Sequence, residues 1–208
     1  MNKPPLEKEV KFYLTDLAGY AERLRSLGAS LTQPRVKEIN FRFDTPDSTL
    51  ARSGVALRLR QDRRVILTLK GASSTVDGVR VRPEVEVVLD DLQNGRAILE
   101  GLGYNIVVCY EKWRTTYQLM GMEVTLDELP YGTFTEIEGT DTETIHQAAS
   151  ALGLMWKARV PYSYLELFAQ VKRELGLSVR NLTFQEFKNI SLAYTDLGVI
   201  PADVHTYF

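Results

Sequence analysis

The chain has 208 residues, of which 44% are hydrophobic and 25% are charged, a composition typical of a soluble globular protein with a sizeable core. Its 25 basic and 27 acidic residues give a net charge of −2, whereas nucleic-acid binders usually carry a basic excess, so we expect no nucleic-acid partner. No stretch is apolar enough to cross a bilayer, and residues 1–5 lack a secretory signal, which predicts a cytoplasmic protein without membrane association.

The supply of cysteine and histidine restricts the kinds of metal site. A single cysteine, Cys109, excludes a disulfide framework within the chain, and its sequence neighbours indicate a small buried residue rather than a nucleophile. His146 and His205 lie far apart in the sequence, which disfavours a zinc site. Carboxylates would therefore hold any metal, and they favour hard cations such as Mg²⁺ or Mn²⁺.

The first ninety residues are predicted to be mostly strands, with one early helix. Apolar residues at helical spacing, followed by Gly28, predict a helix over 16–27. Small residues predict a loop over 71–78, and Pro83, which cannot donate to a strand ladder, indicates an edge or bulged position. Period-two alternation predicts strands over 6–12, 36–44, 55–61, 64–70 and 79–89.

The second part of the chain begins rich in strands and ends helical. A helix is predicted over 90–102, and capping boxes at Thr140, Ser163 and Thr183 predict three more helix starts. We therefore expect one domain over 1–177 and a helical C-terminal extension over 178–208 that packs on it. The remaining expected strands cover 107–110, 112–117, 122–127 and 133–138, and the later helices cover 141–152 and 163–175.

Charged side chains occupy one face of nearly every expected strand. In the first strand Glu7, Glu9 and Lys11 share a face, because alternate residues of a strand point the same way. Arg58 and Arg60 repeat the spacing on a later strand. An open sheet with its charged face in water would explain the pattern. A closed eight-stranded barrel with helices outside and a charged tunnel inside would explain it equally well.

A charged tunnel makes physical sense when it holds a ligand. Unpaired buried charges are costly, so an interior of this kind needs a partner that neutralises it. Arginine and lysine side chains would bind the phosphate oxygens of a polyanion. A carboxylate cluster would hold Mg²⁺ or Mn²⁺ bridging the same phosphates. The expected partner is therefore a small-molecule triphosphate or nucleotide.

The motifs, taken together and in order, resemble the CYTH superfamily, the triphosphate tunnel metalloenzymes. Glu7-x-Glu9-x-Lys11 is similar to the N-terminal signature of that family. This short motif alone is weak evidence for the family. The resemblance continues in the family's order over about residues 6–170. The further matching motifs are Phe43-Asp44-Thr45-Pro46, Leu57-Arg58-Leu59-Arg60, Leu67-Thr68-Leu69-Lys70-Gly71, Arg82-x-Glu84-x-Glu86, Lys112-x-Arg114, Leu126-Asp127 and Phe134-x-Glu136-Ile137-Glu138.

The resemblance implies a fold and a role for individual side chains. The implied fold is α+β, an eight-stranded and mostly antiparallel closed β-barrel clad by α-helices. The implied metal ligands are Glu7, Glu9, Asp127, Glu136 and Glu138. The implied substrate-binding residues are Lys11, Arg58, Arg60, Lys70, Arg82, Lys112 and Arg114. The implied catalytic residues are Lys11, Arg58, Glu84, Glu86 and Asp127.

One stretch departs from the family pattern. The family often has a basic residue just before the Ser-Tyr of a late helix start, whereas this chain has Pro161-Tyr162-Ser163-Tyr164. Lys157 and Arg159 are candidates to supply that charge from a shifted position.

The resemblance implies a divalent-metal-dependent phosphohydrolase that cleaves inorganic tripolyphosphate, thiamine triphosphate or a nucleoside triphosphate. If the ribose 3′-hydroxyl of ATP attacked in place of water, the same site would make cyclic AMP and pyrophosphate, so a class IV adenylate cyclase is the alternative. A module that binds polyphosphate or nucleotide without turnover is a second alternative, although capture alone needs cations more than carboxylates. The C-terminal tail packs on the barrel or on a second copy of the chain, as in a homodimer.

Overall fold

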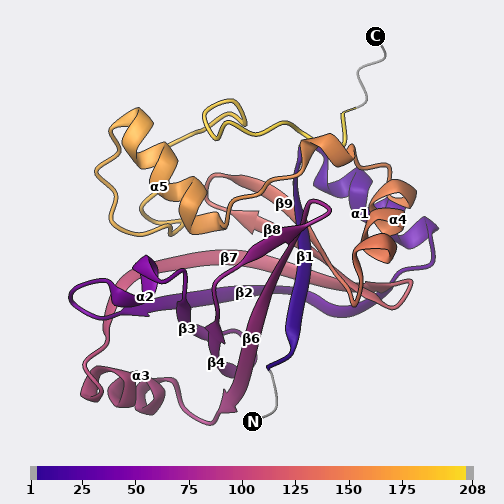
Figure 1. The fold of residues 1–208 in the computed structure, drawn as a ribbon. Helices are drawn as coiled ribbons and strands as arrows, with labels where there is room; N and C mark the ends of the chain where they lie inside the picture. The colour runs from indigo at the N-terminus through magenta and orange to yellow at the C-terminus, as the bar shows by residue number, and fades with distance from the viewer. Residues whose placement is uncertain (1–3, 205–208) are drawn as a thin grey trace.

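The computed structural model describes residues 4–204, and its central element is an antiparallel sheet (Figure 1). The strands in this part of the chain are β1 (Leu6–Leu14), β2 (Ser30–Asp44), β3 (Ala56–Gln61), β4 (Val65–Lys70), β5 (Ser74–Val76), β6 (Val79–Leu89), β7 (Asn105–Leu119), β8 (Met122–Leu129) and β9 (Gly132–Glu138). The helices are α1 (Leu17–Ser26), α2 (Thr49–Arg52), α3 (Leu92–Gly101), α4 (Thr142–Ala151), the 3₁₀ helix η1 (Trp156–Ala158) and α5 (Tyr164–Leu175).

Eight of the strands form a ring. Their order is β1-β9-β8-β7-β2-β3-β4-β6, and β6 pairs back to β1. All of these pairings are antiparallel. The short strand β5 adds to residues 79–81 of β6, and Pro83 lies where β6 changes partner from β5 to β4. The predicted closed sheet of eight strands is therefore confirmed, and the proline lies at a break in the ladder.

The outside of the ring is apolar, and helices cover much of it. In Figure 1, α1 and α4 lie together on one side of the sheet, and α3 lies beside β3 and β4. Buried residues of α1 and α4 pack against Phe12 and Ile137 in one cluster. Leu59 of β3 and Leu99 of α3 belong to another. The alternation along each strand thus places apolar residues outward against helices and charged residues inward.

Aromatic side chains fill one end of the ring. Tyr13 and Phe134 lie on the inward faces of β1 and β9, and the centroids of their rings are 5.1 Å apart. Tyr164 of α5 contacts Phe134 with a centroid distance of 5.3 Å. Leu182 and Phe187 of the C-terminal tail join the same buried cluster. Helix α5 and the tail therefore cover this end of the ring.

The structure does not form the helix predicted after Thr183. The N–H of Phe187 donates to the carbonyl of Thr183 at 3.1 Å, which makes a single turn, and residues 188–204 contain turns and no helix. Glu186, expected to cap the helix, instead accepts hydrogen bonds from the N–H groups of Arg180 and Asn181 at 2.7 and 2.9 Å. Its carboxylate therefore holds the preceding loop. The last part of the predicted extension, 205–208, lies outside the described residues.

Other elements differ from the prediction in extent. The helix α2, the strand β5 and the 3₁₀ helix η1 form in segments with no predicted element, and β7 is one strand where two were predicted. The pairing of β2 with β7 contains register shifts, which allow these two long strands to bend. None of the helices in the described residues has the length and apolarity needed to cross a bilayer.

Candidate active site

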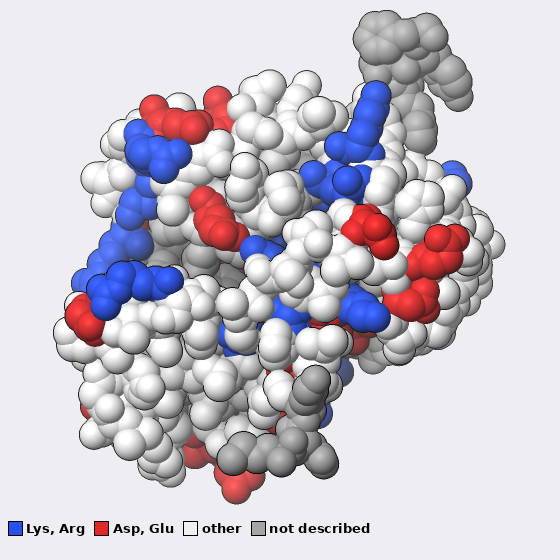
Figure 2. All heavy atoms as spheres, in the orientation of Figure 1, with Lys and Arg blue, Asp and Glu red and all other residues white. Residues whose placement is uncertain are grey.

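The inward faces of the strands surround a cavity of about 610 Å³. Figure 2 shows a hollow in one face of the molecule, between the region of α5 and that of α2, with Lys and Arg side chains along its edge. Asp127 is the one predicted site residue that does not line the cavity. The predicted residues that do are Glu7, Glu9, Lys11, Arg58, Arg60, Lys70, Arg82, Glu84, Glu86, Lys112, Arg114, Glu136 and Glu138.

Three carboxylates lie side by side across β1, β9 and β8. The strand register pairs Glu9 with Glu138 and Glu138 with Glu123. No ion pair joins these three to a cation within the described residues. Partial burial, together with the charges of Glu7, Glu123 and Glu9, raises the pKa of Glu138 to about 8. Because like charges directly opposite each other destabilise a sheet, this row costs the fold free energy.

Glu7 belongs to a second acidic group, which is neutralised by cations. Its Oε1 lies 2.5 Å from the Nζ of Lys70, and its Oε2 accepts a hydrogen bond from the Nε of Arg82 at 3.0 Å. Lys70 also contacts Glu84 at 3.1 Å. Burial opposes ionisation of Glu7, but the two cations lower its pKa, whereas burial and the charge of Glu7 raise the pKa of Glu84. Glu84 is thus the more readily protonated of the two.

Asp127 lies behind the basic wall of the cavity. Its side chain is fully buried, with 0% exposed. Arg114 donates to both of its oxygens, with 2.6 Å between Nε and Oδ1. The Nζ of Lys112 at 3.0 Å and the hydroxyl of Tyr164 at 2.8 Å donate to Oδ2. The structure therefore does not bring Asp127 to the metal-binding or catalytic position that was predicted. It holds Arg114 and Lys112 in place.

Glu38 on β2 is a second buried carboxylate behind this wall, and the sequence prediction missed it. It is 1% exposed and lies 3.5 Å from Lys112, 3.9 Å from Arg114 and 3.8 Å from Arg60. Burial acts against ionisation, but these three cations lower the pKa of Glu38 to about 2. Glu38 lies two residues before the inward Asn40 on an alternating strand, so its side chain points to the same face. This position is the sequence signal that it belongs to the interior.

Arginines in the cavity wall present buried N–H groups without partners. The Nε of Arg42, of Arg58 and of Arg60 has no hydrogen-bond partner in the described part of the chain. The Nη2 of Arg58 contacts Thr68 at 3.2 Å and Glu86 at 3.4 Å, so this guanidinium is fixed while its Nε stays free. Buried polar groups in native proteins are nearly always paired. These Nε atoms are inaccessible from the cavity, so the parts of the three guanidinium groups that a ligand can reach are the other atoms with which they line it.

Lys11 connects the acidic wall with α5. Its Nζ lies 3.2 Å from Glu136 and donates to the carbonyl of Tyr162 at 3.2 Å. The same ammonium lies 4.2 Å from the ring centroid of Tyr164, a cation–π distance. Glu136 also pairs with Arg114 at 2.6 Å. The start of α5 thus sets the position of a predicted phosphate contact.

Several lining residues were absent from the predicted set. Three charged ones, Arg42, Arg80 and Glu123, occupy inward positions of alternating strands, where strand periodicity identifies them, whereas a fourth, Glu166, comes from α5. Tyr110 and Tyr164 also line the cavity. Nothing in the sequence pattern distinguishes these two tyrosines from packing residues, because an aromatic residue on a strand or helix is most often core.

Arg159 does not supply the missing basic residue before the Ser-Tyr pair. Its guanidinium stacks on the ring of Trp156 at 4.5 Å and donates to the Trp156 carbonyl, outside the main cavity. Lys157 is exposed and does not line the cavity either. The cavity instead has Arg80, whose Nη2 lies 3.2 Å from Glu166 in the capping box that starts α5.

The carboxylates can be compared with the needs of a divalent cation. Within residues 4–204 no three of them are grouped closely enough to hold a metal ion as they stand. Glu7 and Glu136 are paired with lysine and arginine, whereas Glu9 and Glu138 oppose each other without a cation. Carboxylate oxygens suit Mg²⁺ or Mn²⁺, and a bound cation would relieve the repulsion in the row. The donor set therefore fits such an ion if Glu7 and Glu136 each give up an ion pair with lysine or arginine and bind the metal ion in its place.

Comparison with known proteins finds relatives that are covered over nearly their whole length and that match about four fifths of this chain. The family model of the CYTH domain matches residues 5–158. A protein of Methanocaldococcus jannaschii named "putative adenylate cyclase" is 27% identical over 174 residues, which are 78% of this chain and 98% of that protein.

Solved structures show the same fold. A protein from Vibrio parahaemolyticus, also named "putative adenylate cyclase", has a TM-score of 0.70 and 22% identity over 80% of this chain and 99% of its own. A Pyrococcus horikoshii protein has a TM-score of 0.65 and 26% identity, and the match covers 78% of this chain and 98% of that protein. A Hippeastrum protein described as a "putative adenylyl cyclase" with a dominant triphosphatase activity has a TM-score of 0.61 and 22% identity. The match covers 78% of this chain and 95% of that protein. Because the family model matches most of the sequence, the chain belongs to the CYTH domain family.

Proposed function

We propose that the protein is a divalent-metal-dependent phosphohydrolase that cleaves a triphosphate inside the ring. The candidate substrates are inorganic tripolyphosphate, thiamine triphosphate and nucleoside triphosphates. One observation supports this above the others: a set of arginine and lysine side chains and a row of carboxylates without cation partners line the same cavity. A polyanion and a divalent cation bound together would satisfy both.

The basic wall is suited to hold the triphosphate. Arg58 and Arg60 lie on β3, and Lys112 and Arg114 lie on β7. The buried carboxylates of Glu38 and Asp127 fix Arg60, Lys112 and Arg114, and Thr68 and Glu86 hold Arg58. Guanidinium groups bind phosphate oxygens through paired N–H donors. Fixed cations also stabilise the charge that develops on a leaving phosphate, without reorganising during the reaction. Lys11, Lys70 and Arg82 extend this set on β1, β4 and β6.

The acidic wall is suited to hold the metal ion. Glu9 and Glu138 are the first candidates as ligands, joined by Glu7 and Glu136 from the same two strands. A bound Mg²⁺ or Mn²⁺ would neutralise phosphate oxygens and lower the pKa of a coordinated water. Asp127, saturated by its four hydrogen bonds, acts in this proposal as a positioning residue for Lys112 and Arg114.

Glu84 and Glu86 are candidates to orient and deprotonate the attacking water. Both line the cavity on β6, and the raised pKa of Glu84 brings it closer to the range in which a general base works well. Glu86 accepts a hydrogen bond from Thr68 at 2.7 Å and pairs with Arg58, which favours a role in fixing the arginine. Glu84 is therefore the stronger candidate for the base.

A cyclase is the alternative that the relatives favour. Two proteins that this chain resembles are named "putative adenylate cyclase". The same cavity would serve if the ribose 3′-hydroxyl of ATP attacked the α-phosphate in place of water. A module that binds without turnover is less well supported, because binding a polyanion does not require a row of unpaired carboxylates.

The experiment is a side-by-side assay on tripolyphosphate, thiamine triphosphate and ATP, with Mg²⁺ and with Mn²⁺. Phosphate release and cyclic AMP are measured in the same samples. We expect phosphate release that a chelator abolishes, and no cyclic AMP. Cyclic AMP formation with ATP would replace the hydrolase by the cyclase, and inertness towards all three compounds would favour a binding module.

A further inference from the structure

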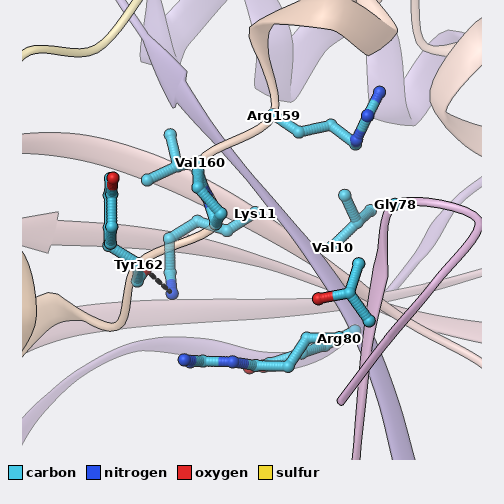
Figure 3. Close-up of a pocket in the computed structure, with 10 residues that line it drawn as sticks. Val10, Lys11, Gly78, Arg80, Arg159, Val160 and Tyr162 are labelled. Atoms are coloured by element: carbon cyan, nitrogen blue, oxygen red, sulfur yellow. Dashed lines mark hydrogen bonds between the residues drawn. The ribbon is translucent and has the colours of Figure 1, made fainter. Parts of the chain in front are cut away.

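Two strands of the ring have a free edge that is covered by a segment outside the sheet. The first is β1, which pairs with β6 from Leu6 to Glu9. Beyond these pairs the N–H of Val160 donates to the carbonyl of Lys11 at 2.8 Å, and the Nζ of Lys11 donates to the carbonyl of Tyr162 at 3.2 Å (Figure 3). The segment that covers this edge therefore also fixes an inward-facing cation of the cavity.

The second free edge belongs to the first half of β7. This strand pairs with β2 along most of its length, but its pairing with β8 begins at Trp113. The C-terminal tail covers the open stretch before it, where Leu182 forms a parallel bridge with Tyr110. The N–H of Leu182 donates to the carbonyl of Cys109 at 3.0 Å, and the N–H of Glu111 donates to the carbonyl of Leu182 at 2.9 Å. The tail thus holds β7 on both sides of Tyr110.

Two more hydrogen bonds link the tail to the same stretch of β7. The Oδ1 of Asn181 accepts from the N–H of Cys109 at 2.9 Å. The N–H of Phe184 donates to the carboxylate of Glu111 at 3.1 Å. We call residues 181–184 the tail clamp, because all of these hydrogen bonds join them to the two neighbours of a single inward-facing residue.

Tyr110 is the residue between these contacts, and it lines the central cavity. It belongs to the buried aromatic cluster at the end of the ring that the tail covers. Its hydroxyl lies among cations: burial opposes ionisation, but the charges of Arg58 and Lys112 lower the pKa of Tyr110. The strand register agrees, because Tyr110 pairs with Asn40, which in turn pairs with Arg60. The side chain therefore reaches from the covered end of the ring into the basic wall.

The surroundings of the Tyr110 hydroxyl supply no acceptor for its proton. Arginine and lysine donate hydrogen bonds and cannot accept them. Two other tyrosines of the same cluster do have protein acceptors: Tyr131 donates to the carbonyl of Tyr164, and Tyr164 donates to Asp127, both at 2.8 Å. In the described part of the chain the Tyr110 hydroxyl donates to no protein group, so an anion in the cavity is the partner that suits it.

We propose that Tyr110 is a substrate contact whose hydroxyl donates a hydrogen bond to a phosphate oxygen, and that the tail clamp positions it. This inference rests on the proposed function, because it adds a residue to the same site. A phosphate bound between Arg58 and Lys112 lies beside the hydroxyl, and a donor held in place binds it without reorganising. The family model ends at residue 158, so a segment beyond the shared domain fixes a residue inside it.

The first test is Tyr110→Phe, which removes the hydroxyl and keeps the aromatic ring. Phosphate release with Mg²⁺ gives kcat/KM for tripolyphosphate and for ATP, and calorimetry with EDTA gives the affinity for tripolyphosphate without turnover. Loss of one hydrogen bond to a charged group should lower all three values by about 10-fold to about 100-fold. The losses should be alike on both substrates, because the hydroxyl contacts the phosphate chain. Tyr117→Phe, on the same strand but outside the cavity, is the matched control.

The second test is Asn181→Ala, which removes one hydrogen bond of the tail clamp. It should lower kcat/KM by about 2-fold to about 10-fold. In the Tyr110→Phe background its effect should be smaller, because the hydroxyl that the clamp positions is already gone. The exposed Asn189→Ala in the same tail is the matched control. Should Asn181→Ala unfold, Glu186→Gln decides, since Glu186 accepts from the N–H and the Nδ2 of Asn181.

The outcomes separate the inference from the proposed function. Undiminished affinity and kcat/KM in Tyr110→Phe would overturn the substrate contact, and so would a loss confined to ATP. Equal losses from Asn181→Ala with and without the hydroxyl would overturn the role of the tail clamp. A wild-type protein that binds tripolyphosphate and cleaves none of the candidate substrates would overturn the proposed function, and the affinities would still decide the inference. A protein that does not bind tripolyphosphate at all would overturn both.

Discussion

The basic and the acidic walls of the cavity are built in opposite ways. On the basic side, Arg114 and Lys112 rest on the buried carboxylates of Asp127 and Glu38, so each cation already has a counter-charge behind it. On the acidic side, the row that includes Glu9 and Glu138 has no cation behind it in the described residues.

The difference shows which wall is complete before a ligand arrives. Cations that are held by buried carboxylates keep their geometry and can bind an anion without moving. Carboxylates that only repel one another lower the stability of the empty protein, and a bound cation would recover that free energy. The basic wall is thus preorganised, whereas the acidic wall would be completed by the metal ion of the proposed function.

The largest effect should come from removing a counter-charge behind the basic wall. Asp127→Asn removes the carboxylate charge that pairs with Arg114 and Lys112. Removing one partner of a buried ion pair costs about 3–5 kcal/mol. Urea unfolding should show this loss of stability, together with a large loss of turnover. Glu123→Gln is the control, and it should not destabilise, since Glu123 has no cation partner in the described residues. Equal stability of Asp127→Asn and wild type would contradict the contrast between the walls.

Removing a charge from the acidic wall should lower activity strongly without lowering stability. Glu9→Gln is expected to lower kcat/KM by about 100-fold or more, because second-shell and ligand changes typically cost at least 10–100-fold in metal affinity or activity. Its stability without metal should be equal to or higher than that of wild type. The exposed Glu22→Gln on α1 is the matched control. Undiminished activity of Glu9→Gln would refute the metal assignment.

A substitution within the basic wall should act on binding. Arg58→Ala removes a guanidinium group that lines the cavity, and charge-assisted hydrogen bonds contribute about 1.5–3 kcal/mol each. We expect KM for the preferred triphosphate to rise by about tenfold to about a hundredfold. The exposed Arg96→Ala on α3 should leave KM unchanged. A normal KM in Arg58→Ala would exclude a phosphate contact at this residue.

The repulsion in the acidic row gives a smaller prediction on stability. Above pH 8, where Glu138 is ionised, Glu138→Gln removes one of the opposed charges, so the metal-free protein should gain about 0.2–1 kcal/mol in its free energy of unfolding. The rise in Tm on adding Mg²⁺ should become smaller than in wild type, because less repulsion remains to be relieved. Thermal unfolding with and without Mg²⁺ measures both. A loss of metal-free stability would show that the row does not carry strain.

The smallest effect concerns a residue outside both walls. Burial, together with the charges of Glu111 and Glu186, raises the pKa of the Cys109 thiol to about 11. The reactive thiolate is therefore scarce at pH 8, and alkylation by iodoacetamide should speed up about tenfold per pH unit until pH 11. Mass spectrometry follows the modification. The alkylation rate should not change when Mg²⁺ is added. A change would show that metal binding in the cavity affects the surroundings of Cys109.

The strands, their inward charges and the family could be predicted from the sequence. Period-two alternation is a local property, and it identifies the side chains that share the charged face of β1, β3, β6 and β9 without knowledge of their neighbours. A complete set of such strands, in the order that the family shows, left the closed sheet as the consistent fold. The helix after Thr183 was predicted from a capping box, and it fails because Glu186 finds backbone N–H partners in the preceding loop.

The sequence by itself determined which side chains share a strand face, because alternation needs only the chain. The tertiary structure decided what each of them faces. Asp127 and Glu38 lie behind the cations, although their strand positions resemble those of Glu9 and Glu138, because strand register and the placement of Tyr164 by α5 choose their partners.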